Sequence, residues 1–401
     1  MSGEKLILLL DIDGVLLESV GYRSACVDTI NDFIACMGQP GLTVDRQTAD
    51  TFEVIGVKAE WDMVPLALAA FADSCIGQTG IIPEEDVFPP DFSAASFPSP
   101  EVFRTMIQEK IRAYAGMPDL NLNVIDAVRI GCEKGKVLPF LRKTPLFDRF
   151  FTGTLDPWKS PFFAQLMCRL LGSETFAEFY GMAAPLECDS YLAVKDRLLV
   201  SDHYRKLLPE LYPRAYPVVM TYRPTRLPAC DGNMRELYYV NTPEGECALR
   251  LLGWENGRMP MIGSGSLCYT EAKYGLRRES YVKPHPFHIL ASVMMALCRN
   301  EMQALEAARI LCEGDPRQED DPLMPYAAPD VTIRLAVFED SVSGIEGTKN
   351  AVSVLRRWGR NAEAVLCGIR STGEKTALLS RTGALIYQNV NEAFDEVIGK
   401  I

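Results

Sequence analysis

The sequence contains few histidines and no long run of basic residues. Only three histidines occur in 401 residues, and no pair of cysteines has the spacing of a zinc ribbon. Lys and Arg number 41 against 53 Asp and Glu, which gives a formal net charge of −12. Because the phosphate backbone of a nucleic acid attracts basic patches, this charge argues against a nucleic-acid partner.

Features of secreted and membrane proteins are also missing. The first residues show no basic segment and no small-residue cleavage site, and the apolar run at residues 6–10 is too short to span a bilayer. The twelve cysteines are scattered, and several fall on apolar faces, as buried thiols in a reducing compartment do. We therefore expect a soluble, cytoplasmic protein with no membrane partner.

The length of the chain and its patterning predict two domains. From about residue 205 onward, apolar runs alternate with helical patterns, which is typical of a parallel α/β sheet. Helical spacing and loops dominate before that point, for example at Tyr22–Met37 and Trp61–Cys75. We predict an α/β fold: a Rossmann-like parallel sheet from residues 1–17 and 205–401, with a mainly α-helical domain at 18–204.

Two further segments carry local signals. Ser99-Pro100 predicts the start of a helix, because Ser suits the cap position and Pro the first turn. Residues 314–330 are acidic and contain proline, which predicts a mobile surface loop.

The stretch KLILLLDIDGVLL at residues 5–17 carries the first chemical signal. A short apolar run that ends at a glycine is typical of a strand buried on both faces of a parallel sheet. Such sheets bind ligands at the carboxyl ends of their strands, where Asp11 and Asp13 stand. The alternative is a surface turn in which Asp and Gly only end the strand.

Three later stretches also place polar groups after apolar runs. Thr221 ends PVVMT, Lys283 follows YV by way of a loop, and Glu339 with Asp340 ends the run from Val331. The ends of parallel strands meet at one edge of a sheet, so these groups are expected to come together. Acids, a hydroxyl and a cation in one place form, chemically, a magnesium-assisted phosphoryl-transfer site.

The four motifs, in this order, resemble those of the haloacid dehalogenase superfamily of phosphohydrolases. DIDGVLLES, VVMT, VKPHP and VFEDSVSGI are similar to its first to fourth motifs, and the last is close to the form of the β-phosphoglucomutase and phosphoglycolate-phosphatase branch. The resemblance covers residues 1–17 and about 205–401. For the block between them it supplies only a class, a cap inserted between the first and second motifs.

The resemblance implies separate roles for the two aspartates of the first motif. Asp11 would attack phosphorus and form an acyl-phosphate, which divides hydrolysis into two easier steps. Asp13 would protonate the leaving oxygen and then take a proton from the attacking water. Members that cleave carbon–halogen or carbon–phosphorus bonds lack this second aspartate, so its presence favours phosphate esters.

The second and third motifs would hold the phosphoryl group. Thr221 would donate a hydrogen bond to a phosphoryl oxygen; an ordinary hydroxyl at a strand end is the alternative. Lys283 would neutralise charge on the phosphoryl group and on the nucleophile; an exposed surface lysine is the alternative.

The resemblance also implies a Mg²⁺ site. Its ligands would be Asp11, the backbone carbonyl of Asp13, and Asp340, with Glu339 ligating directly or through water. Ser341 either contacts the metal or caps the following helix.

Two departures from the family pattern concern the substrate. Tyr222 follows the motif threonine where relatives often have a small residue, and together with Arg223 it is a candidate for substrate specificity. The cap is also longer than this class usually shows.

Within the cap, one helix start carries charges and a large aromatic side chain. These residues either read the substrate or form a solvated helix end; they are Lys58, Glu60, Trp61 and Asp62. His285 and His288 have no third ligand near them in the sequence and are predicted to be structural or phosphate-adjacent.

We therefore predict a Mg²⁺-dependent hydrolase, a phosphatase acting on a small phosphorylated metabolite, as a monomer or homodimer. A phosphomutase that returns the phosphoryl group to a sugar is the alternative, because the two differ in how long the aspartyl-phosphate survives. A non-catalytic binding or regulatory protein on the same fold is a second alternative, and the four intact motifs count against it.

Overall fold

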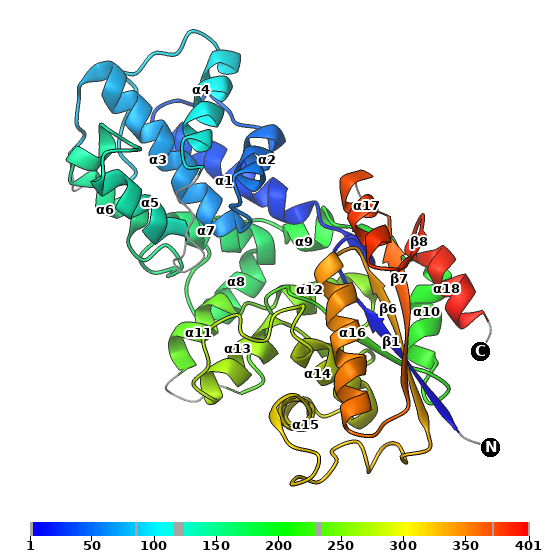
Figure 1. Ribbon diagram of the computed structural model, residues 1–401. Coiled ribbons are helices and arrows are strands. Elements are labelled where there is room, and N and C mark those ends of the chain that lie inside the picture. The colour runs from blue at the N-terminus through cyan, green and yellow to red at the C-terminus, as the bar shows by residue number, and fades with distance from the viewer. Residues whose placement is uncertain (1–2, 85–86, 116–123, 230–233, 371–372, 400–401) are drawn as a thin grey trace. The chain divides into compact units, whose positions relative to one another are not determined.

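The chain folds into two compact units, one built on a parallel sheet and one built from helices. The computed structural model describes residues 3–84, 87–115, 124–229, 234–370 and 373–399. Met1–Ser19 and Asp196–Ile401 form the sheet unit, and Val20–Lys195 forms the helical unit. The predicted α/β fold with a Rossmann-like parallel sheet and inserted helices is confirmed (Figure 1).

All eight strands found in the described residues belong to the sheet unit. They are β1 Glu4–Leu10, β2 Leu17–Glu18, β3 Arg197–Leu198, β4 Tyr216–Met220, β5 Met261–Ile262, β6 Thr332–Glu339, β7 Ala362–Ile369 and β8 Leu385–Tyr387. Its helices are α10 Asp202–Leu207, the 3₁₀ helix η2 Leu208–Glu210, α11 Arg235–Val240, α12 Glu244–Leu252, α13 Ser264–Lys273, α14 Phe287–Cys298, α15 Glu301–Glu313, α16 Val342–Arg357, α17 Gly373–Arg381 and α18 Val390–Ile398.

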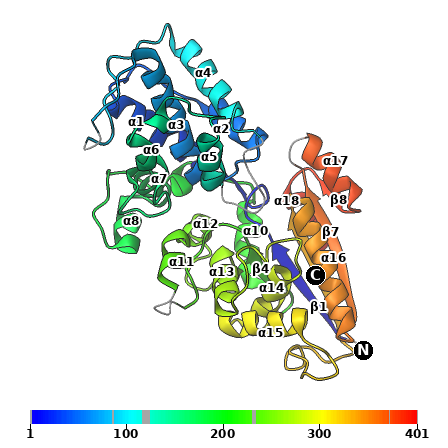
Figure 2. The same ribbon diagram turned by 60° about the vertical axis from the view of Figure 1, so that its left-hand side comes forward.

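The main sheet has six parallel strands in the order β5-β4-β1-β6-β7-β8. Strand β1 is central, with β4 on one side and β6 on the other; Leu10 pairs with both Val219 and Phe338. Figure 1 shows β1 beside β6, and Figure 2 shows it beside β4. The carboxyl ends of these three strands therefore lie next to one another, where parallel sheets bind ligands.

Strand β1 is apolar from Leu6 to Leu10 because helices cover both faces of the sheet. Ile7 and Leu9 pack in one core with α14, α15 and α16, while Leu8 and Leu10 pack in the other with α10, α12 and α18. A strand buried on both sides reads as a continuous apolar run rather than an alternating one. The pattern that predicts this strand thus reflects its central place in the sheet.

The second boundary of the helical unit lies earlier than the sequence predicts. Residues 196–204 belong to the sheet unit, because Leu198 pairs with Leu17 in the antiparallel ladder of β3 with β2, and Tyr204 is buried in the sheet core. Strand β3 is only two residues long and exposed, so it is too short to give a strand pattern in the sequence.

The described residues of the helical unit form nine α-helices and one 3₁₀ helix. They are α1 Gly21–Cys36, α2 Arg46–Val54, α3 Glu60–Thr79, α4 Pro100–Arg112, α5 Val124–Glu133, the 3₁₀ helix η1 Leu141–Lys143, α6 Leu146–Phe151, α7 Pro161–Leu171, α8 Ser173–Tyr180 and α9 Tyr191–Val194. Ser99 caps α4 as predicted, since its side chain accepts a hydrogen bond from the N–H of Val102. Aromatic side chains fill the core; Phe71 lies 5.8 Å from Phe92 and 6.0 Å from Phe103 between ring centroids.

Two other expectations meet the structure here. The 314–330 segment contains neither helix nor strand and is largely exposed, in line with the predicted surface loop. It is tied to the sheet unit at two points, because Leu323 is fully buried and Arg360 donates to the carbonyl of Ala327 at 2.8 Å; its mobility stays a prediction. Across the described ranges, no helix has both the length and the apolar character of a membrane span.

The helical unit also buries one carboxylate completely. Asp73 on α3 accepts from the N–H groups of Phe140 and Leu141 at 2.8 and 2.9 Å and from the Lys110 ammonium at 2.6 Å. Asp73→Ala leaves these donors without their acceptor, so we expect the free energy of unfolding to fall by about 2–4 kcal/mol. Urea unfolding followed by circular dichroism measures this.

Two control variants separate the buried contacts from a general effect. Asp73→Asn keeps an oxygen for the two amides and should lose less stability than Asp73→Ala. Asp50→Ala, on the exposed side of α2, should change stability by less than about 0.5 kcal/mol. If Asp73→Ala unfolded at the same urea concentration as wild type, the carboxylate would not stabilise the segment around Phe140 and Leu141.

Candidate active site

Strands β1 and β6 deliver three acids to one edge of the sheet. Asp11 follows β1 directly, and its N–H donates to the carbonyl of Phe338 at 3.2 Å, which continues the β1–β6 ladder. Glu339 is the last residue of β6, and Asp340 follows it. Each of the three offers a carboxylate oxygen, and these oxygens lie within 4.8 Å of one another.

Burial and mutual repulsion make this acidic cluster unfavourable without a cation. Asp11 and Glu339 are buried, at 8% and 1% exposed. Burial raises the pKa of Asp11 well above its ordinary value, the Lys283 ammonium opposes this, and the charges of Glu339, Asp13 and Asp340 add to it. Burial likewise raises the pKa of Asp340 to about 6, against the opposing charge of Lys375. The cluster therefore favours a positive charge in its midst.

Lys283 supplies one such charge from a loop. Its Nζ lies 3.0 Å from Asp11 Oδ1 and 2.5 Å from Glu339 Oε1. Burial opposes the charged form of Lys283, but the two carboxylates outweigh it and raise its pKa, so the ammonium is charged. The apolar residues before Lys283 form turns rather than a strand, which corrects the strand-like reading of that run.

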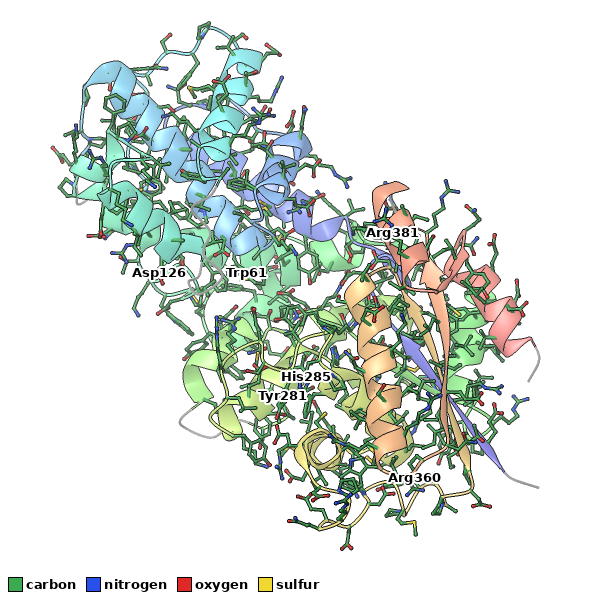
Figure 3. All side chains as sticks on the ribbon, viewed as in Figure 1. Trp61, Asp126, Tyr281, His285, Arg360 and Arg381 are labelled. Atoms are coloured by element: carbon green, nitrogen blue, oxygen red, sulfur yellow. The ribbon has the colours of Figure 1, made fainter. Side chains whose placement is uncertain are left out.

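The loop that carries Lys283 is anchored on both sides of it. Tyr281 stacks on Phe287 with ring centroids 3.8 Å apart, and its N–H donates to Glu271 Oε1 at 2.8 Å. His285 lies beside Tyr281, with ring centroids 5.3 Å apart (Figure 3), and its Nδ1 accepts from the N–H of Phe287 at 3.2 Å. These contacts give His285 a structural role, in line with the prediction, and they fix the loop from which Lys283 extends.

Ser341 orients Glu339 and caps α16 at the same time. Its hydroxyl donates to Glu339 Oε2 at 2.8 Å and accepts from the N–H of Gly344 at 3.2 Å. Of the two roles open for Ser341, the geometry shows the helix cap.

Two glycines leave room for the acids. Gly14 has φ +76°, and a Cβ there would lie 2.5 Å from Asp340 Oδ2. A Cβ at Gly344 would lie 1.9 Å from Glu339 Oε1. Larger side chains at either position would displace a carboxylate of the cluster.

Asp13, a fourth acid near this edge, is bound by an arginine. Arg223 Nε lies 3.0 and 3.1 Å from the two oxygens of Asp13, and Nη2 lies 2.6 Å from Oδ1. Burial would raise the pKa of Asp13, but the charge and hydrogen bonds of Arg223, with a hydrogen bond from Ser19, lower it. Arg223, a candidate for substrate specificity in the sequence, thus binds an acid of the site itself.

Thr221 directly follows β4 and lies at the same edge of the sheet. It is fully buried; its N–H donates to the carbonyl of Ile262 at 3.0 Å, and its Oγ1 accepts from the N–H of Arg223 at 3.1 Å. His288 Nε2 lies 3.1 Å from the same Ile262 carbonyl. Burial and the charge of Lys283 lower the pKa of His288 to about 3, so its ring is neutral and structural, as predicted.

The remaining candidates lie outside this cluster. Tyr222 is 48% exposed in the sheet unit, next to Thr221. Lys58, Glu60, Trp61 and Asp62 belong to the helical unit at the start of α3, where Trp61 is labelled in Figure 3. Glu60 forms an ion pair there with Arg23 at 2.9 Å, a contact within its own unit.

Sequence reasoning missed one residue of the site, Asp196. Its carboxylate is fully buried and lies 2.9 Å from Arg223 Nη2. It stands in a polar segment with no motif around it, so only the fold reveals it.

The residues present fit a hard divalent cation. Asp11, Glu339 and Asp340 offer three carboxylate oxygens at close range, and oxygen is the donor that Mg²⁺ prefers. Lys283 and Ser341 also bind Glu339, whereas the cation beside the Asp340 carboxylate is Lys375, at the longer distance of 3.7 Å.

Comparison with known proteins gives a fold and no activity. No protein-family model matches the chain, and no curated protein matches it. A solved X-ray structure, described as a target of the Northeast Structural Genomics Consortium, is similar with a TM-score of 0.64 at 12% identity, over 99% of each chain. At that identity the likeness shows the shared fold alone.

Gly344→Ala tests whether stability and metal binding depend on the space that Gly344 leaves for the Glu339 carboxylate. Alanine normally favours a helix over glycine by about 1 kcal/mol. Here its methyl group would displace the Glu339 carboxylate, so we expect the free energy of unfolding to fall by about 1–3 kcal/mol. We also expect Mn²⁺ binding, measured by isothermal titration, to weaken about tenfold or more.

Gly347→Ala is the matched control on the same helix. A Cβ at Gly347 meets Ile289 Cγ1 at an ordinary 3.5 Å, so this variant should be unchanged or more stable by up to about 1 kcal/mol. Equal behaviour of the two variants would contradict the packing of Glu339 described above.

Proposed function

We propose that the protein is a Mg²⁺-dependent phosphatase that hydrolyses a small phosphate monoester through an aspartyl-phosphate. The observation that carries this proposal is the Lys283 ammonium, 3.0 Å from Asp11 and 2.5 Å from Glu339, in a buried cluster of three carboxylates. The resemblance of the four motifs to the haloacid dehalogenase superfamily supports the same reaction.

Asp11 is the proposed nucleophile. Its Oδ would bond to phosphorus as the bond from phosphorus to the leaving oxygen breaks. Lys283 would neutralise charge on Asp11 and on the phosphoryl group, since its Nζ already contacts Asp11 Oδ1. Thr221, at the end of the neighbouring strand, would hold a phosphoryl oxygen.

Asp13 is the proposed general acid–base. It would give a proton to the leaving oxygen in the first step and take one from the attacking water in the second, which releases phosphate and restores Asp11. Arg223 lowers the pKa of Asp13 and so holds it as the carboxylate, the form that accepts a proton in the second step.

Mg²⁺ would be held by Asp11 and Asp340, with the backbone carbonyl of Asp13 and with Glu339 directly or through water. When bound, the ion supplies Lewis-acid stabilisation of charge on the phosphoryl oxygens. The chain's own residues orient the reacting groups around it.

A small phosphorylated metabolite is the proposed substrate, and Tyr222 and the start of α3 are the proposed places where it is read. A cytoplasmic setting is part of the proposal; the cysteines of the described residues are free thiols, which suits a reducing compartment.

Phosphate release from a panel of phosphomonoesters, including p-nitrophenyl phosphate and sugar phosphates, tests the function. We expect release with Mg²⁺ and none with EDTA. Asp11→Asn should abolish release while leaving the circular dichroism spectrum unchanged, because an amide is not a nucleophile for phosphorus.

Asp320→Asn is the matched control, an exposed acid of the same unit, and should keep wild-type activity. Turnover that survives Asp11→Asn would overturn the mechanism. Interconversion of sugar-phosphate isomers without net phosphate release would point to a mutase, and inertness toward the whole panel would favour a non-catalytic role.

A further inference from the structure

Arg223 makes more contacts than the binding of one acid requires. Its side chain is 2% exposed, and Nη2 reaches three groups: Asp13 Oδ1 at 2.6 Å, Asp196 Oδ2 at 2.9 Å and the Ser19 hydroxyl at 3.0 Å. The Ser19 hydroxyl in turn donates to Asp13 Oδ1. One guanidinium thus joins Asp13 to two residues far apart in the chain.

Ser19 and Asp196 occupy a particular place in the chain. Ser19 is the last residue of the sheet unit before the chain enters the helical unit, and Asp196 is the first residue after it returns. Leu17 pairs with Leu198 and Glu18 with Arg197, so the next step of this register sets Ser19 opposite Asp196. We call these two places, Ser19 and Asp196, the crossings of the chain between its two units. Arg223 therefore binds both crossings, next to the end of the β2–β3 ladder.

We propose that Arg223 is a positioning residue that ties the carboxylate of Asp13 to both crossings of the chain. The inference rests on the proposed function, because it assigns Arg223 a task for the proposed acid–base. A displacement of either crossing moves Ser19 or Asp196, and the shared guanidinium passes that displacement to Asp13.

The chemistry of the contacts requires an arginine. Nε and Nη2 together fix the plane of the Asp13 carboxylate, and Nη2 at the same time serves Asp196, whose side chain is fully buried. A planar fork with several fixed donors meets this demand, whereas a lysine ammonium is a single point of charge. Lys at this position would keep the charge and lose the orientation.

The dependence of rate on the leaving group tests the positioning of Asp13. An alkyl phosphate needs a proton on its leaving oxygen, whereas p-nitrophenolate departs without one. General acid help is worth about 10²–10⁴-fold, so we expect Arg223→Met to lower kcat for alkyl phosphates about tenfold or more beyond any loss with p-nitrophenyl phosphate. Arg223→Lys should recover part of that difference, with KM little changed.

Hydrogen exchange of the full chain tests the tie to the crossings, and it needs no activity. The amides of Leu199 and Val200 donate to the carbonyl of Leu16 at 2.9 and 3.4 Å. In Arg223→Met these amides should exchange about tenfold faster than in wild type. Unchanged exchange would overturn the tie, and equal losses on both classes of ester would overturn the positioning of Asp13.

Two further variants complete the design. Asp196→Asn weakens one anchor without touching Asp13 and should show the same two effects, smaller; it keeps the test decisive where Arg223→Met fails to fold. Arg197→Met, in an exposed pair with Glu18 on the same ladder, should leave both readouts at wild-type values. If wild type hydrolyses no ester, the proposed function fails, while the exchange experiment still decides whether Arg223 holds the crossings.

Discussion

The contact of the Lys283 ammonium with Asp11 and Glu339 is the interaction on which the site depends. Three carboxylates whose oxygens lie within 4.8 Å repel one another, and burial removes the water that would screen them. The Lys283 ammonium offsets this repulsion, since its Nζ lies 3.0 Å from Asp11 Oδ1 and 2.5 Å from Glu339 Oε1. The loop that carries Lys283 is held in place by the stacking and hydrogen bonding of Tyr281. The strands bring the acids together, and the cation on the loop reduces the repulsion between them.

A second buried cation divides the acids of the first motif into two environments. Arg223 engages Asp13, while Lys283 engages Asp11, and the pKa values of the two aspartates move in opposite directions. A single residue, Ile12, separates these carboxylates in the sequence, yet one is held as an anion and the other shares a crowded cluster. The two cations thus give neighbouring carboxylates of one sheet edge different electrostatic surroundings.

The sequence predicts the sheet and its polar edge well, because both follow from local patterns. Fully buried strands read as apolar runs, so the strand ends near Asp11, Thr221 and Glu339 could be located from the pattern of apolar residues alone. Contacts that depend on distant segments could not be located so. Asp196 immediately precedes a strand of only two exposed residues, and the acidic 314–330 segment gives no sign that Leu323 is buried. Charge and proline content describe a segment's surface, not what its few apolar side chains reach.

The short β2–β3 ladder has a consequence for how such a chain can change over evolutionary time. Because Leu17 and Leu198 are partners across the ladder, the chain leaves the sheet unit and returns to it at neighbouring points, about 5 Å apart. The β2–β3 hydrogen bonds form within the sheet unit and do not depend on the length of the segment between Ser19 and Asp196. The inserted segment is thus free to lengthen, shorten or be exchanged without moving a strand, as domain insertions commonly are. A long insert is what this architecture permits.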